Sequence, residues 1–373
     1  MPCPCASQVG AALGYDQRWD DMLFRTTARK VGIRIPQAPP SAEVLGSRST
    51  RHPRPTDPRA PAPPLRLSKS LAFIPVDFPV PGRVECRAFS HRRLAQDNKD
   101  KPEVAIQGTR LYGWGLILGA SSGFGEATAL SLAREGVHIF GVHLDRKATL
   151  ETVERITAEI KAMGREAVFF NVNAADAEKR QEVLDHIEKV LADRGEPGSM
   201  KVLLHSLAFG ALRPFISENP KEALTQSQME MTLDVMANSL VYWTQDLVRR
   251  KLMGSGGRIF AMTSSGGNHV WPTYGAVSAA KAALEAHVRQ LAYELAPLRI
   301  TANCIRAGVT DTPALRKIPG NEKLVEGALA KNPHGRLTTP ADVAAAIAAL
   351  CIGNTHWITG NIIGVDGGED LTG

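Results

Sequence analysis

Tyr274 and Lys281 have the residue types and the spacing to act as one chemical unit. They lie seven positions apart in a stretch with helical periodicity. Because seven residues make close to two helical turns, both side chains are expected on one helix face. A phenol ionises with a pKa of about 10, and a neighbouring cation lowers that value. The pair therefore predicts a phenol that gives a hydrogen bond or a proton to a substrate. The alternative is a surface tyrosine beside a solvated lysine.

A glycine-rich turn with the spacing G-x-x-x-G-x-G precedes this pair in the chain. It follows a short apolar run and opens a helical pattern. Glycines allow the backbone to approach a pyrophosphate, and the helix N-terminus offers free N–H groups to it. A purely structural turn is the alternative, but the position between strand and helix favours dinucleotide binding. The candidate contacts in the turn are Gly119, Ser121, Ser122, Gly123, Phe124 and Gly125.

The end of the second apolar run bears on the choice of nucleotide. An acid there would accept a hydrogen bond from a free ribose 2′-hydroxyl, but the residue 18 positions beyond Gly125 is His143. Asp145 follows, and then Arg146 and Lys147, whose charges suit a 2′-phosphate. We therefore expect NADPH, contacted by His143 and Arg146, with NADH as the alternative. In the competing interpretation the two cations are solvated and Asp145 caps a helix.

Short apolar runs alternate with longer helical patterns from residue 111 onward. This alternation predicts an α/β protein: a single doubly wound Rossmann domain with a parallel sheet of about seven strands and helices on both faces. Ligands are expected at the C-terminal ends of the strands. The predicted strands are 114–118, 138–143, 167–171, 202–206, 258–263, 300–305 and 361–365. One predicted helix follows the glycine turn and ends near 134. The other predicted helices span 146–163, 177–194, 226–252 and 274–295.

Residues 1–108 differ in composition from the rest of the chain. They contain 15 of the 24 prolines and 17 Lys+Arg against 10 Asp+Glu, whereas residues 109–373 contain 27 and 28. The sequence predicts a disordered Pro/Arg-rich extension over 1–108 and a Rossmann-type domain over 109–373. The extension could be a tail, a targeting segment or the product of a mis-set start. The near-neutral domain gives no indication of nucleic-acid binding.

The cysteines and the hydropathy place further limits on function. No CxxC pair or Cys/His cluster is present, so we expect no metal site and reduced thiols in a cytoplasmic protein. No apolar run reaches the roughly 18 residues of a membrane span, so no membrane insertion is expected. The five cysteines are Cys3, Cys5, Cys86, Cys304 and Cys351.

Over residues 116–371 the chain resembles the short-chain dehydrogenase/reductase superfamily. The glycine turn, the Tyr/Lys pair and the ending ITGNIIGVDGG at 358–368 carry this resemblance. Most members place the tyrosine four residues before the lysine, where Val277 stands here. The seven-residue spacing of Tyr274 and Lys281 resembles the enoyl-[acyl-carrier-protein] reductases instead. So do the HSLAF segment at 205–209, Met236 in place of an active-site asparagine, and Ala307 before Gly308.

The resemblance to enoyl reductases has two limits. The best-known bacterial enzymes have a longer glycine turn and a further tyrosine at the position of Ser264. The chain is most similar to an NADPH-dependent variant from Gram-positive bacteria that has the ordinary turn and a serine there. Ser264 also lies 17 residues before Lys281, as the catalytic serine of ordinary members does. The resemblance implies further cofactor contacts at Asn171, Val172, Ser206, Leu207, Ala208, Lys281, Gly308, Thr310 and Thr312.

These similarities lead us to expect an enoyl-[acyl-carrier-protein] reductase of fatty-acid synthesis. Tyr274 would donate a hydrogen bond to the thioester oxygen and Lys281 would bind the nicotinamide ribose, with Ser264 as a third catalytic candidate. A ketoreductase or alcohol dehydrogenase acting on 3-oxoacyl thioesters or hydroxysteroids is the first alternative. A non-catalytic NADP-binding sensor is the second, although retention of Tyr274 and Lys281 argues against it.

The resemblance also implies partners and a substrate cover. The expected partners are an acyl-carrier protein or a coenzyme A thioester, and a homotetramer formed through helices 226–252 and 274–295. Residues 313–332 are expected to cover the substrate. Their apolar members would line an acyl channel and their basic members would meet an acidic carrier, unless the charged face is merely solvated. The apolar candidates are Leu315, Ile318, Leu324 and Val325, and the basic ones are Arg316, Lys317 and Lys323.

Overall fold

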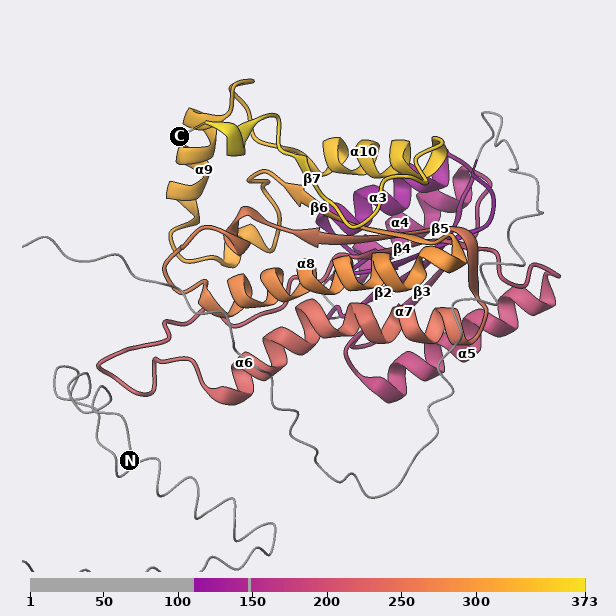
Figure 1. The fold of residues 1–373 in the computed structure, drawn as a ribbon, viewed down its shortest axis with the longest axis horizontal. Coiled ribbons are helices and arrows are strands. Elements are labelled where there is room, and N and C mark those ends of the chain that lie inside the picture. Colours follow the sequence, from indigo (N-terminus) through magenta and orange to yellow (C-terminus); the bar gives the residue numbers. More distant parts are fainter. Residues whose placement is uncertain (1–110, 147–148, 373) are drawn as a thin grey trace, which may run out of the picture. The chain divides into compact units, whose positions relative to one another are not determined.

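Seven strands pair in parallel and form one sheet, in the order β3-β2-β1-β4-β5-β6-β7 (Figure 1). The computed structural model describes residues 111–146 and 149–372, so the predictions for residues 1–108 and for Lys147 lie outside the described residues. The predicted α/β class with about seven parallel strands is confirmed. The strands are β1 (Trp114–Leu118), β2 (His138–His143), β3 (Ala167–Asn171), β4 (Met200–His205), β5 (Met253–Thr263), β6 (Thr301–Ala307) and β7 (Ile362–Val365).

The central strands are apolar because both faces of a parallel sheet are covered. All five residues of β1 are buried, and the Trp114 indole stacks on Phe140 of β2 with ring centroids 4.2 Å apart. The predicted bounds of β1, β2 and β3 agree with the structure. β4 and β5 begin earlier than predicted, at Met200 and Met253. The pairing register shifts between Met200 and Val202, so the first part of each strand lacks the regular pattern.

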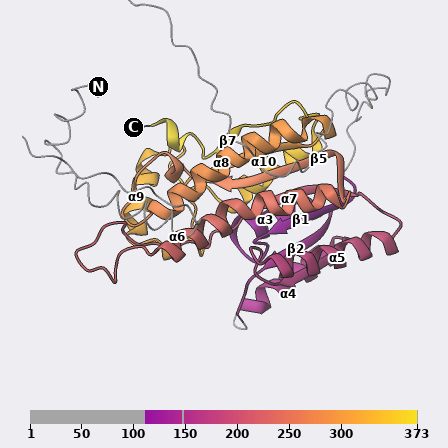
Figure 2. The ribbon, with the colours of Figure 1, turned by 60° about the horizontal axis from the view of Figure 1, so that its bottom comes forward.

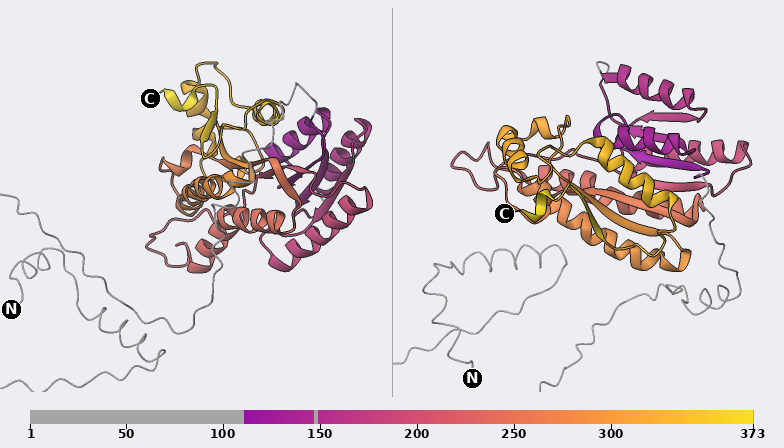
Figure 3. Two further views of the ribbon diagram at one scale, coloured as in Figure 1. Left: turned by 45° about the vertical axis from the view of Figure 1, so that its right-hand side comes forward. Right: turned by 90° about the horizontal axis from the view of Figure 1, so that it is seen from above.

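Helices cover both faces of the sheet, as Figures 2 and 3 show. Two separate apolar clusters fill the space between the helices and the strands. Burial of these apolar surfaces is the main favourable contribution to folding. One face is covered by α3 (Gly123–Arg134), α4 (Leu150–Ala162) and α10 (Pro340–Ile352), and the other by α5 (Ala177–Asp193), α7 (Ser239–Arg249) and α8 (Gly275–Leu295).

The helix predicted over 226–252 is confirmed as one helical run that ends at Arg249, but it contains a π-helical turn that the periodicity did not predict. It consists of α6 (Gln226–Leu233), a π-helical turn η3 (Asp234–Asn238) and α7. The Ser239 hydroxyl donates to the Val235 carbonyl oxygen at 2.8 Å, within the π turn. A π turn adds one residue to a helix without ending it, so hydrophobic periodicity does not reveal it. Its effect here is to bury Met236 against the core, with 2% of the residue exposed.

Two further features bear on the site. The segment 313–332 contains the short turn η6 (Leu315–Lys317) and helix α9 (Asn321–Lys331), so it is itself partly helical. The carboxyl ends of β1 and β4 lie where the strand order changes direction, which is where open α/β sheets bind ligands. Within the described residues, no helix combines the length and the apolar character needed to cross a membrane.

Candidate active site

The glycine turn between β1 and α3 is shaped for close backbone contacts. A Cβ added to Gly119, whose φ is +88°, would lie 2.3 Å from the Ser206 carbonyl oxygen. A Cβ added to Gly125 would lie 1.9 Å from the Gly119 carbonyl oxygen. Only glycine therefore fits at these two positions. The turn lies beside the residues that follow β4, and Gly123 contacts Thr312, whose Cγ2 would be 3.4 Å from an added Cβ. Three predicted cofactor segments thus meet here, and their backbone fits a pyrophosphate at a helix N-terminus.

Asp145, just beyond β2, is the acid that faces this turn. Its carboxylate lies 2.9 Å from the His143 Nδ1 and accepts a hydrogen bond from the Thr149 hydroxyl at 2.8 Å. The Ser121 side chain of the glycine turn lies near this carboxylate. Burial raises the pKa of Asp145, but Ser121, Thr149 and His143 together outweigh it and the pKa lies below its ordinary value. The group presented to the turn is therefore an ionised carboxylate.

The neighbouring predicted residues support Asp145. His143 is buried, so its ring orients the carboxylate from behind, away from solvent. Asn171 at the end of β3 forms two 3.0 Å hydrogen bonds with the Asp145 backbone, at its N–H and its carbonyl oxygen. The Val172 N–H donates to the His143 carbonyl oxygen at 2.8 Å. Arg146 is exposed. The residue 18 positions beyond Gly125 is His143, but the group at the nucleotide turn is Asp145. The difference arises because the chain extends two residues past β2 before it turns.

The remaining predicted cofactor residues lie at the same edge of the sheet. Ser206, Leu207 and Ala208 follow β4, and the Ser206 N–H donates to the Leu118 carbonyl oxygen at 2.9 Å. Gly308 and Thr310 follow β6, where the buried Thr310 hydroxyl donates to the Gly308 carbonyl oxygen at 2.9 Å. The structure thus places every predicted cofactor segment at the carboxyl ends of the strands.

Tyr274 lies at the N-cap of α8, one residue ahead of the first helical residue. Its ring lies over Gly266: a Cβ added there would be 2.5 Å from the Tyr274 Cε1 and 3.3 Å from the Ser264 Oγ. Burial raises the pKa of the Tyr274 phenol, and the nearby Ser264 hydroxyl offsets only part of that effect. This direction is opposite to the one that pairing with Lys281 predicted. The phenol therefore keeps its proton and acts as a hydrogen-bond donor.

Lys281 is buried two turns into α8. Its Nζ donates to the Met262 carbonyl oxygen at 2.6 Å, next to the end of β5. Burial lowers the pKa of Lys281 to about 8, and Cys304 and Glu285 act in the opposite direction. Ser264, two residues after Met262, has a buried Oγ without hydrogen-bond geometry to any other described residue. Met262, Ser264, Lys281 and Tyr274 thus form one group at the end of β5.

His205 belongs to this group, and the sequence indicated it only as part of the HSLAF segment at 205–209. His205, at the end of β4, is fully buried, and its Nε2 lies 2.8 Å from the Ser239 Oγ. Because the Ser239 hydroxyl donates to Val235, the His205 Nε2 must carry the proton. Burial, assisted by Lys281, lowers the pKa of His205 to about 3, so the imidazole is neutral. The HSLAF segment carried a family resemblance, but no feature of the sequence predicted that this imidazole is buried and neutral.

Trp271, three residues before Tyr274, connects the segment 313–332 to the group formed by Met262, Ser264, Lys281 and Tyr274. The Trp271 indole donates to the Pro319 carbonyl oxygen at 3.2 Å, and its ring lies 3.7 Å from a Cβ added to Gly320. Of the predicted basic contacts, Arg316 forms a bidentate pair with Asp311 at 2.7 and 2.8 Å, so its charge is already compensated. Lys317 and Lys323 are exposed. Of the predicted apolar contacts, Leu315 is buried, whereas Ile318, Leu324 and Val325 are half-buried.

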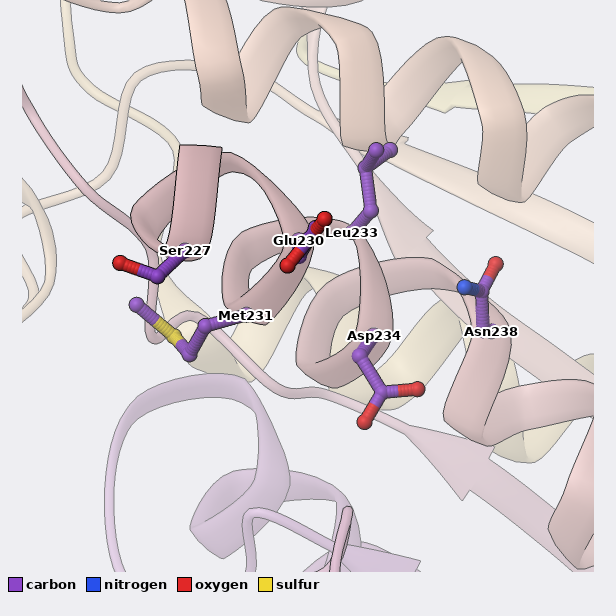
Figure 4. A pocket seen from close by; sticks show the side chains of 6 residues that line it. All are labelled: Ser227, Glu230, Met231, Leu233, Asp234 and Asn238. Atoms are coloured by element: carbon purple, nitrogen blue, oxygen red, sulfur yellow. The ribbon is translucent and has the colours of Figure 1, made fainter. Parts of the chain in front are cut away.

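A pocket of about 530 Å³ lies on the outer side of α6 and η3 (Figure 4). It contains none of the predicted site residues, so it is not the catalytic site. Burial raises the pKa of Asp234 in this pocket, and the charge of Arg180 acts in the opposite direction. The pocket lies on a helix pair that was expected to contact another subunit. Its lining residues are Ser227, Glu230, Met231, Leu233, Asp234 and Asn238.

Comparison with known proteins adds to this geometry. Residues 119–369 match the family described as "Enoyl-(Acyl carrier protein) reductase". A chloroplastic NADPH-dependent aldehyde reductase-like protein from Arabidopsis thaliana is 30% identical over 262 residues, which cover 68% of this chain and 92% of that protein. A 3-oxoacyl-[acyl-carrier-protein] reductase from Thermotoga maritima is 28% identical over 253 residues, covering 68% and 96%.

An enoyl-[acyl-carrier-protein] reductase (NADH) from Aquifex aeolicus is similar in sequence and in structure. Its sequence is 28% identical over 271 residues, which cover 72% of this chain and 93% of that protein. Its crystal structure superposes with a TM-score of 0.59, at 27% identity and with coverage of 72% and 98%. Enoyl and keto reductases are thus similar to this chain to about the same degree.

Proposed function

Because this chain belongs to the enoyl-(acyl carrier protein) reductase family of the short-chain dehydrogenase/reductase superfamily, we propose that it reduces the double bond of a 2-enoyl thioester. The chain is an oxidoreductase with a Rossmann fold, and a bound nicotinamide would supply the hydride. We propose that the hydride acceptor is an unsaturated acyl chain carried by acyl-carrier protein or coenzyme A, as in fatty-acid synthesis.

The observation that carries the proposal is the buried, protonated phenol of Tyr274 ahead of α8. Reduction of an enoyl thioester places negative charge on the thioester oxygen, which a neutral donor stabilises without giving up its proton. Such a positioned donor is worth about 10²–10³ in rate. A ketone, by contrast, becomes an alkoxide and takes a full proton, which a phenol of raised pKa gives less readily.

The other residues of the site divide the remaining tasks. Lys281 lies where its ammonium would hold the nicotinamide ribose, and Met262 orients it. The glycine turn and Thr312 would hold the pyrophosphate. Trp271 and the half-buried apolar residues of 313–332 would shield the acyl chain from water.

Ketoreduction is the second candidate because of Ser264. Its buried Oγ beside Tyr274 lacks hydrogen-bond geometry to any other described residue, and a substrate carbonyl would satisfy it. We propose to separate the two reactions with the purified protein, crotonyl and acetoacetyl thioesters, and NADPH and NADH side by side. Faster cofactor oxidation with the crotonyl thioester is expected. Turnover of the acetoacetyl thioester alone would establish the ketoreductase, and cofactor binding without turnover of either would favour the sensor.

The cofactor proposal follows from Asp145. The sequence pattern favoured NADPH, but an ionised carboxylate near Ser121 of the glycine turn would repel a 2′-phosphate and accept a ribose hydroxyl. We therefore propose NADH as the preferred cofactor, although exposed Arg146 keeps some activity with NADPH. Asp145→Ala is expected to raise the NADPH:NADH ratio of kcat/KM by about 10-fold or more, since about 1.4 kcal/mol corresponds to tenfold.

The cofactor prediction has a matched control. Asp193→Ala removes an exposed carboxylate at the end of α5, remote from the glycine turn, and should leave the ratio unchanged. The proposal would be contradicted if the wild-type enzyme preferred NADPH and Asp145→Ala left the NADPH:NADH ratio of kcat/KM unchanged. That result would support the NADPH preference expected from the sequence. We also propose a homotetramer through α6, α7 and α8, for which light scattering should give a mass four times that of the chain.

A further inference from the structure

Glu285 is a buried carboxylate that neither substrate nor cofactor binding explains. It lies on α8, four residues after Lys281, with 7% of its surface exposed. Its Oε1 accepts a hydrogen bond from the Thr263 hydroxyl at 2.7 Å. The same oxygen would lie 3.4 Å from a Cβ added to Gly267, so the carboxylate sits beneath the loop that follows Ser264. Buried carboxylates cost free energy unless a nearby charge or donor compensates them.

The nearby charge that Glu285 can compensate is the ammonium of Lys281. Burial lowers the pKa of Lys281 to about 8, and Cys304 and Glu285 raise it against that effect. The other groups that face Lys281 supply no negative charge. His205 of β4 is neutral, because its pKa is about 3. Cys304 of β6 is a neutral thiol, because burial raises its pKa to about 12. Arg289, one turn further along α8, is itself cationic and is exposed.

The two buried charges of α8 are linked to consecutive residues of β5. Lys281 donates to the carbonyl oxygen of Met262, and Glu285 accepts from the side chain of Thr263. Ser264 is the next residue, and Tyr274 lies beside it. A change at Glu285 can therefore act through the charge of Lys281 or through the position of the strand end, and these two effects must be separated.

We propose that Glu285 is a positioning residue whose negative charge keeps Lys281 protonated and directed at the cofactor ribose. The inference rests on the proposed function only for the choice of substrate. It assigns no contact between Glu285 and substrate or cofactor. Without this negative charge, Lys281 would lose its proton at a lower pH. Activity and cofactor affinity would then also decline at a lower pH.

The test compares Glu285→Gln, Glu285→Asp and Thr263→Val with Glu294→Gln, an exposed position of the same helix. Two quantities are measured between pH 6 and 9.5: kcat/KM for the crotonyl thioester, and the Kd of NADH from its fluorescence. For Glu285→Gln, the alkaline decline of both should move to lower pH by about half a unit or more. At pH 6 both values should lie within about twofold of wild type, whereas at pH 8.5 they should be at least about 2.5-fold worse. Glu285→Asp, Thr263→Val and Glu294→Gln keep the buried charge, so their declines should stay at the wild-type pH.

Two outcomes overturn the proposal. One is a Glu285→Gln protein impaired by the same factor at every pH, which indicates a structural role only. The other is a Thr263→Val protein whose decline moves to lower pH, which assigns the effect to the strand end and applies even if Glu285→Gln does not fold. If no thioester is turned over, the proposed function fails, but the pH dependence of NADH binding still decides the role of Glu285.

Discussion

Tyr274 and Lys281 share a helix but experience different surroundings. Tyr274 precedes α8 and lies beside Ser264, whereas Lys281 is buried against β5. The pKa of the phenol is raised and that of the ammonium is lowered, in both cases because burial disfavours the charged form. At the residue scale, the two groups therefore suit separate tasks: under the proposed function, Tyr274 would donate to the substrate and Lys281 would hold the cofactor.

Tyr274→Phe and Lys281→Ala should each lower kcat by about 10²–10³, because each removes a positioned donor. The measurement is NADH oxidation with the crotonyl thioester, together with a thermal melt to show that the fold is retained. Tyr293→Phe serves as the control, since Tyr293 lies on the same helix and is 73% exposed. Normal turnover in both site variants would contradict the assignment.

His205 makes the stability of the fold depend on pH. Its pKa is about 3 in the folded protein and about 6.5 when unfolded, so the unfolded chain binds more protons between these values. The free energy of unfolding should therefore fall as the pH drops through this range, by about 1.4 kcal/mol per pH unit from this group. The pKa values of His138 and His287 are also lowered and add in the same direction.

Urea unfolding of His205→Asn between pH 4 and 7 tests this contribution. The variant should lose stability less steeply with acid than wild type, by about one bound proton. His356→Asn, at an exposed position, should keep the wild-type slope. A His205→Asn protein with an unchanged slope would show that the imidazole is already charged in the folded state.

At the scale of elements, the loop before α8 connects the catalytic tyrosine to the segment 313–332. The Tyr274 N–H donates to the Trp271 carbonyl oxygen at 3.1 Å, which closes a turn. Thr273 within this turn has φ of +64°, a conformation that a β-branched residue rarely adopts. Because Trp271 also donates to Pro319, movement of the segment 313–332 would be transmitted through this strained turn to Tyr274.

Trp271→Phe should raise KM for the thioester and lower kcat, together by about 2- to 10-fold in kcat/KM, because one hydrogen bond of about 0.5–1.5 kcal/mol is lost. The Kd of NADH should not change, since among the described residues Trp271 forms no hydrogen bond with a predicted cofactor residue. Trp357→Phe is the control, because that indole is 89% exposed. Unaltered steady-state constants for Trp271→Phe would mean that the segment moves independently of the tyrosine.

At the scale of the whole molecule, the sheet and every residue of the proposed site lie between Leu111 and Thr372. The division at residues 108 and 109 remains a prediction from composition. A chain of residues 109–373 should therefore bind NADH and turn over the crotonyl thioester within about twofold of the full chain. Enzyme assays and a thermal melt of both proteins provide the check. Loss of folding in the shorter chain would show that residues 1–108 contribute to the domain.

Local sequence determined a large part of this protein. The periodicity of short apolar runs predicted the parallel sheet, because strands buried on both faces are nearly continuous in hydrophobic residues. The glycine spacing predicted the nucleotide turn, because only glycine allows the backbone contacts seen at Gly119 and Gly125. The types and spacing of Ser264, Tyr274 and Lys281 predicted a catalytic group, and the structure brings these residues together at the end of β5. Each of these signals comes from residues that are close together in the sequence.

Tertiary structure decided what depends on distant contacts and on burial. The Trp271–Pro319 bond joins residues 48 positions apart, and the Thr263–Glu285 bond joins residues 22 apart, so no local pattern announces either. Asp145 replaced His143 as the group at the glycine turn because Ser121, from another element, meets it there. The pKa of Tyr274 rose instead of falling because burial outweighs the other effects on it. Burial is set by the packing of the whole sheet and its helices, which residue types and spacing do not contain.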